Sequence, residues 1–82
     1  MNIKVFGMTN CAGCVTVKSV LEQRGVEYEY FDVNHHADME EAMKHNIRSV
    51  PTTVITHGDH SYETIVGSSP EQLKIILQSV GV

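Results

Sequence analysis

Two cysteines, Cys11 and Cys14, stand three positions apart directly after a short β-type run at the start of the chain. They are the only cysteines among 82 residues, which is too few for a disulfide framework or a closed four-ligand zinc site. Residues 3–6 alternate and predict a strand ending at Gly7, and apolar residues recur at helical spacing over 12–24. The sequence therefore predicts a strand–loop–helix unit with Cys11 at the N-terminus of the helix.

The middle of the chain adds a strand and a short helix. Residues 26–33 are rich in aromatic and β-branched types and predict a strand, parallel to the first because a helix joins the two. Asp38 is suited to be a helix N-cap with an acid three residues later, and Asn46 is suited to end that helix in a left-handed conformation. Met39 and Met43 lie four apart on this helix, so we expect both to pack against the sheet.

The last third predicts a hairpin followed by a helix. Residues 52–56 and 62–66 are β-rich, and the turn sequence at 57–60 between them favours an antiparallel hairpin. Ser69 and Pro70 are the residue types of a helix N-cap and first helical position. The resulting element order is βαβαββα.

Composition agrees with one domain spanning residues 1–82. The chain is 41% hydrophobic and 20% charged, with a formal charge of −4, which excludes a disordered composition. The acidic balance and the scattered Lys and Arg residues argue against a nucleic-acid partner. No run approaches the roughly 18 apolar residues of a membrane span, and the first residues lack the apolar stretch of a signal peptide. We therefore expect a cytoplasmic protein without membrane contact.

The cysteine spacing has a chemical meaning at the start of a helix. A thiol attacks a disulfide only as its thiolate, and the free N–H groups and dipole of a helix N-terminus would stabilise that anion at Cys11. One turn further in, Cys14 would be close enough to displace a substrate held on Cys11 as a mixed disulfide. In a reducing compartment such a pair indicates redox chemistry or part of a metal site. The other interpretation is a pair of small buried apolar residues.

A proline stands where a strand is predicted to begin. Within a central strand Pro51 would remove a hydrogen-bond donor, so its expected place is the first residue of the strand. A cis Val50–Pro51 peptide there would turn the N–H and C=O of Val50 outward, where they could pair with an extended partner chain. A trans proline that simply starts the strand is the alternative.

These elements in this order resemble a known family. A first strand, C-x-x-C, Val-Pro-Thr at 50–52, a hairpin, a glycine and a last helix are similar to the thioredoxin superfamily, and within it to the glutaredoxins. The resemblance covers essentially the whole chain. It implies an α/β, thioredoxin-like (glutaredoxin) fold, a four-stranded mixed sheet flanked by helices. It also implies a thiol–disulfide oxidoreductase with Cys11 as nucleophile and Cys14 as resolving cysteine.

The resemblance further implies a substrate surface around the cysteines. Pro51 would be the cis proline beside them. The residues that the resemblance assigns to substrate binding are Thr9, Asn10, Val50, Pro51, Gly67, Ser68 and Ser69. It implies a monomer with no metal and no tightly bound cofactor, which reduces protein disulfides with glutathione as co-substrate or thioredoxin reductase as electron source.

Two stretches depart from the pattern of glutaredoxins that use glutathione, which carry a lysine before C-P-Y-C and a Gly-Gly-x-Asp-Asp loop. Here residues 8–14 are Met-Thr-Asn-Cys-Ala-Gly-Cys and residues 67–71 are Gly-Ser-Ser-Pro-Glu. The second stretch is similar instead to the Gly-Phe-Arg-Pro-Asp loop of the NrdH redoxins, with Ser68 and Ser69 in place of Phe and Arg. Those proteins carry electrons from thioredoxin reductase to ribonucleotide reductase, which makes the latter enzyme a candidate partner.

The start of the chain also resembles a second family. Residues 7–15 are similar to the Gly-Met-Thr-Cys-x-x-Cys loop of heavy-metal-associated domains, metallochaperones that hold Cu(I) between two thiolates. Here Asn10 adds one residue before the first cysteine, and those domains run βαββαβ and end on a strand. A Cu(I) metallochaperone is therefore the alternative function. An iron–sulfur cluster bridged between two copies would use Cys11 and an outside thiol, and nothing in the sequence bears on it.

Overall fold

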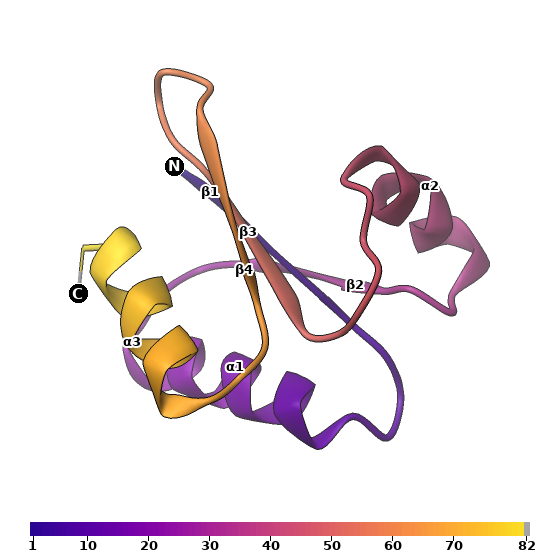
Figure 1. The fold of residues 1–82 in the computed structure, drawn as a ribbon, viewed down its shortest axis with the longest axis horizontal. Helices are drawn as coiled ribbons and strands as arrows, with labels where there is room; N and C mark the ends of the chain where they lie inside the picture. The colour runs from indigo at the N-terminus through magenta and orange to yellow at the C-terminus, as the bar shows by residue number, and fades with distance from the viewer. Residues whose placement is uncertain (82) are drawn as a thin grey trace.

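The computed structural model describes residues 1–81. Its elements follow the expected order βαβαββα (Figure 1). They are β1 (Asn2–Gly7), α1 (Ala12–Gln23), β2 (Glu29–Asp32), α2 (His36–Lys44), β3 (Thr52–Thr56), β4 (Tyr62–Val66) and α3 (Pro70–Ser79). The four strands form one mixed sheet in the order β2-β1-β3-β4, with β1 parallel to β2 and antiparallel to β3. The expected thioredoxin-like architecture is confirmed.

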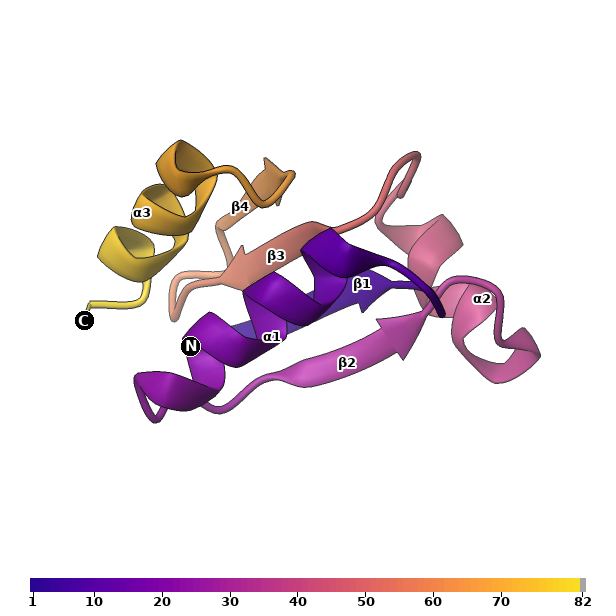
Figure 2. The ribbon, with the colours of Figure 1, turned by 90° about the horizontal axis from the view of Figure 1, so that it is seen from below.

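The helices cover both faces of the sheet, with α1 and α3 on one side and α2 on the other (Figures 1 and 2). On the α1 side a buried cluster joins strand and helix residues, among them Val5, Leu21 and Ile76. On the α2 side the cluster is smaller and is built on Phe6, whose ring stacks on Phe31 at 5.1 Å between centroids. Neighbouring residues of β1 therefore point to opposite cores, as strand geometry requires.

The second strand is shorter than the sequence predicts, Glu29–Asp32 in place of residues 26–33. The chain leaves α1 through Gly25, whose φ of +69° is the expected left-handed ending. The N–H of Val26 then closes the helix by donating to the C=O of Leu21 at 2.9 Å. Because that N–H is used for the helix end, Val26 does not join the sheet.

The predicted start of the second helix is wrong by three residues. Its N-cap is His35, which makes no side-chain capping hydrogen bond. Asp38 lies in the first turn and accepts from the N–H of Asp32 at 3.0 Å, so its carboxylate holds the end of β2. The left-handed ending at Asn46 is confirmed, with φ +59°.

Met39 and Met43 do not fill the core, and their expected packing against the sheet is wrong. Their exposed fractions are 43% and 74%. Ala42 occupies the buried position of α2 and joins the cluster around Phe6. The small Ala42 side chain brings the helix backbone close to the sheet and leaves both methionines outside it.

An ion pair between Lys4 of β1 and Glu41 ties α2 to the sheet. The hydrogen bond from Lys4 lowers the pKa of Glu41, partly opposed by burial of the carboxyl. A lowered folded pKa means that the pair stabilises the fold above the ordinary value of about 4.3, and that this contribution is lost as pH falls through the folded value. Glu41→Gln should therefore reduce the unfolding free energy by about 1 kcal/mol at pH 7.

The same comparison at pH 3 provides the control for Glu41→Gln. At that pH the carboxyl of the unfolded chain is largely protonated, so the charge of Glu41 contributes less to the unfolding free energy, and wild type and variant should give urea denaturation midpoints that lie closer together than at pH 7. A difference that stays constant from pH 7 to pH 3 would show that the charge of Glu41 contributes nothing.

Candidate active site

The two cysteines begin α1, as the sequence predicts. Cys11 is the N-cap, and its Sγ accepts a hydrogen bond from the N–H of Cys14 at 3.1 Å. The two sulfurs form a disulfide. Cys11 is partly exposed, whereas Cys14 is 1% exposed and faces the core. A partner molecule can therefore reach only Cys11.

The electrostatics of this helix end favour a negative charge on Cys11. The first turn of α1 contains no acidic residue that would compensate the positive end of the helix dipole. The N–H of Cys14 already points at the Sγ of Cys11. When the disulfide opens, the same contact becomes a charge-assisted hydrogen bond to the thiolate.

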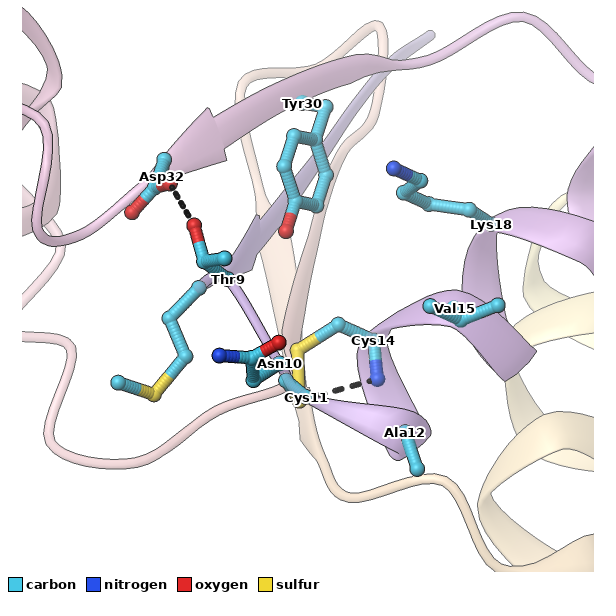
Figure 3. Close-up of a pocket in the computed structure, with 10 residues that line it drawn as sticks. Thr9, Asn10, Cys11, Ala12, Cys14, Val15, Lys18, Tyr30 and Asp32 are labelled. Atoms are coloured by element: carbon cyan, nitrogen blue, oxygen red, sulfur yellow. Dashed lines mark hydrogen bonds between the residues drawn. A yellow bond between two sulfur atoms is a disulfide. The ribbon is translucent and has the colours of Figure 1, made fainter.

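A groove of about 610 Å³ opens beside the cysteines, between the β1–α1 loop, α1 and the end of β2 (Figure 3). Thr9 and Asn10 from the loop line it, as do both cysteines. The hydroxyl of Thr9 donates to the carboxylate of Asp32 at 3.4 Å, and Asn10 takes a left-handed φ of +63°. Both cysteines and two of the residues expected to bind substrate therefore lie at this groove.

Tyr30 and Lys18 also line the groove, and neither was expected as a site residue. Tyr30 of β2 extends its hydroxyl toward the sulfur of Cys14, over Gly7 (Figure 3). Lys18 of α1 places its Nζ 4.1 Å from the centre of the Tyr30 ring, a cation–π contact. Burial raises the pKa of Tyr30, and the charge of Asp32 raises it further.

On the side away from the groove, the start of α1 at Gly13 contacts two segments of the chain, one at Pro51 and one at Gly67 and Ser68. The Val50–Pro51 peptide is cis, as predicted. A Cβ on Gly13 would stand 2.6 Å from the Oγ of Ser68 and 3.1 Å from the Cδ of Pro51, so these three residues are in close contact. The N–H of Gly67 donates to the C=O of Pro51 at 2.9 Å, which fixes the two segments to each other.

The remaining expected site residues divide into two kinds. Val50 is partly exposed beside Pro51, and its N–H and C=O have no hydrogen-bond partner within residues 1–81. Ser69 instead uses its hydroxyl to cap α3 at the N–H of Gln72. The structure thus places Pro51 and Ser68 against Gly13, between the two cysteines, and gives Ser69 a capping contact on α3.

Comparison with known proteins assigns the family. The family model described as Glutaredoxin matches residues 3–60, which include both cysteines and the cis proline. The chain belongs to the glutaredoxin family. This family and the C-x-x-C pair support thiol–disulfide oxidoreductase activity.

Solved structures place this glutaredoxin near several thioredoxin-like proteins. The thioredoxin-like protein BC3987 is 33% identical with a TM-score of 0.71, covering 93% of this chain and 100% of that one. The NrdH-redoxin of Escherichia coli is 22% identical with a TM-score of 0.67, covering 93% and 95%. The oxidised thioredoxin of Plasmodium falciparum is 22% identical with a TM-score of 0.74, covering 98% and 80%. A search of curated proteins found no match.

The element order argues against the Cu(I) metallochaperone alternative. Heavy-metal-associated domains are expected to run βαββαβ and to end on a strand, whereas this glutaredoxin runs βαβαββα and places α3 after its last strand.

Within residues 1–81, no helix has the length and apolar character needed to cross a membrane.

Proposed function

We propose that the protein reduces protein disulfides by cycling between a Cys11–Cys14 disulfide and a dithiol, with Cys11 as nucleophile. The observation that carries the proposal is the unequal exposure of the paired sulfurs at the N-terminus of α1, partly open at Cys11 and closed at Cys14. Membership of the glutaredoxin family supports the reaction class.

The cycle requires two exchanges. The Cys11 thiolate attacks one sulfur of the substrate, the substrate disulfide breaks, and one substrate thiolate leaves. The Cys14 thiolate then attacks the Sγ of Cys11, which forms the internal disulfide and releases the second substrate thiolate. Two electrons have passed from the protein to the substrate. A reductant restores the dithiol by the same chemistry in reverse.

The surface around Cys11 supports a protein substrate. Ala12 and Val15 of α1 are exposed beside it, Val15 at 59%. On the other side, Val50 offers an N–H and a C=O without partners among residues 1–81. An extended peptide segment can satisfy both backbone groups while its own apolar side chains cover Ala12 and Val15.

The proposal extends to the partners named by the sequence resemblance. Ribonucleotide reductase is the protein disulfide substrate, and either glutathione or thioredoxin reductase returns electrons to Cys11. The loop Gly67–Glu71 supports this extension by its similarity to the NrdH redoxins.

A coupled assay tests the proposal. NADPH oxidation is followed with insulin as disulfide substrate, once with thioredoxin reductase and once with glutathione and glutathione reductase. We expect one system to drive turnover at least about tenfold above the rate without the protein, which names the reductant. If neither reductase system drives turnover above the rate without the protein, the proposed function is wrong. Oxidised ribonucleotide reductase then replaces insulin to test the named partner.

A further inference from the structure

The hydroxyl of Tyr30 lies beside the buried sulfur of the redox pair. A Cβ built on Gly7 would stand under 3.0 Å from both the Tyr30 hydroxyl and the Sγ of Cys14, so these two atoms occupy neighbouring space above one glycine. Figure 3 shows the hydroxyl directed toward that sulfur. The register that pairs Val5 with Tyr30 places this side chain on the α1 face of the sheet.

Cys14 needs a partner of this kind because its sulfur must carry charge twice in each cycle. It is a thiolate when it resolves the mixed disulfide, and it is the leaving thiolate when a reductant opens the internal disulfide. Burial at 1% exposure opposes that charge. Its own N–H is directed at the Sγ of Cys11 and does not serve its own sulfur.

We propose that the Tyr30 hydroxyl donates a hydrogen bond to the Cys14 thiolate each time this thiolate forms in the cycle. This inference rests on the proposed function, which gives Cys14 the resolving role. In resolution, the Cys14 thiol gives its proton to water in the groove, the thiolate attacks Cys11, and the substrate thiolate leaves. In reduction, the reductant thiolate bonds to Cys11 and the electron pair of the broken bond goes to Cys14.

The charged groups around the pair are consistent with a hydroxyl that stays a donor. Burial and the carboxylate of Asp32 raise the pKa of Tyr30, so the phenol keeps its proton in neutral solution. From α1, the ammonium of Lys18 lies over the Tyr30 ring and holds its position. Cys11 is the remaining titratable group at this end of the groove once the disulfide is open.

Tyr30→Phe tests the inference because it removes only the donor oxygen. The reduced protein is mixed with dithiobis(nitrobenzoic acid), and the coloured thiolate is followed by stopped flow. Attack by Cys11 releases a first equivalent and resolution by Cys14 a second. The rate of the first phase should be unchanged in Tyr30→Phe. The rate of the second phase should fall below wild type at low pH and rise above it at high pH.

Loss of one hydrogen bond to a charged group raises the Cys14 pKa by about one unit, which lowers the thiolate fraction about tenfold below that pKa. The more basic thiolate is intrinsically about threefold more reactive. The second phase should therefore be about threefold slower than wild type at low pH and about threefold faster at high pH. A purely structural defect would change the rate in the same direction at every pH.

Tyr28→Phe is the matched control, since its hydroxyl bonds Glu22 instead of reaching the groove. Its two phases should match wild type, and thermal melting checks that both variants fold. Coinciding profiles of Tyr30→Phe and wild type, or a pH-independent change, would overturn the inference while leaving the proposed function intact. If Cys14→Ser still released two equivalents, the resolving role itself would be wrong.

Discussion

Replacing Cys11 by Ser should reduce disulfide turnover to the rate measured without protein. Cys11 is the sulfur that a substrate can reach, and the helix end around it stabilises a thiolate. A serine hydroxyl is not ionised at neutral pH and forms no disulfide, so neither exchange can begin. The measurement is insulin reduction in the coupled assay, with circular dichroism to verify the fold.

Cys14→Ser should also stop turnover, but at a later step of the cycle. Its Cys11 still attacks, but no second thiol resolves the product, so a mixed disulfide with the substrate should accumulate and appear by mass spectrometry without reductant. The roles would be reversed if Cys11→Ser accumulated the mixed disulfide and Cys14→Ser did not.

Gly7→Ala should impair both stability and turnover. The added Cβ would stand under 3.0 Å from the Tyr30 hydroxyl and the Cys14 Sγ, and 3.0 Å from the Cys14 Cβ. Gly7 does not have a positive φ, so the effect comes from this overlap and not from the backbone. Overpacking of this kind costs about 1–3 kcal/mol, and any relief must move Cys14 or Tyr30. Urea denaturation and the coupled assay measure the two effects.

Gly58→Ala is the matched control for Gly7→Ala. No atom lies within 4 Å of the Cβ that it would add, and its φ is not positive. Its unfolding free energy should stay within about 0.5 kcal/mol of wild type, with unchanged turnover. Equal results for the two alanine variants would mean that the space above Gly7 is not required by the site.

The sequence was sufficient for the element order because each element carries its own local signals. Residues that begin or end helices, such as Gly25, Asn46 and Ser69, act within one turn of the chain, and all three have the expected conformation or contact. The errors occurred where a distant or competing partner decides. Val26 does not join β2 because its N–H bonds the end of α1. Asp38 does not cap α2 because its carboxylate accepts a hydrogen bond from the N–H of Asp32.

The candidate site divides in the same way. The position of Cys11 follows from nearby residue types, whereas these left cis and trans open at Val50–Pro51, and the cis peptide was predicted through the family resemblance. The place of Tyr30 depends on the register between β1 and β2, which aligns it with Val5 and which no local pattern specifies. Lys18 lies four residues after Cys14 on one helix face, so the sequence already places its charge near the cysteines, but its contact with the Tyr30 ring depends on the same strand register.

The burial of Cys14 limits how many clients the protein can hold at one time. With one sulfur inside the fold, only a single covalent bond to another molecule can form, so the protein cannot link two clients through its redox pair. Each client must be discharged before the next can attach. Electrons therefore pass to one client molecule at a time, and attack by the buried Cys14 sulfur releases each client.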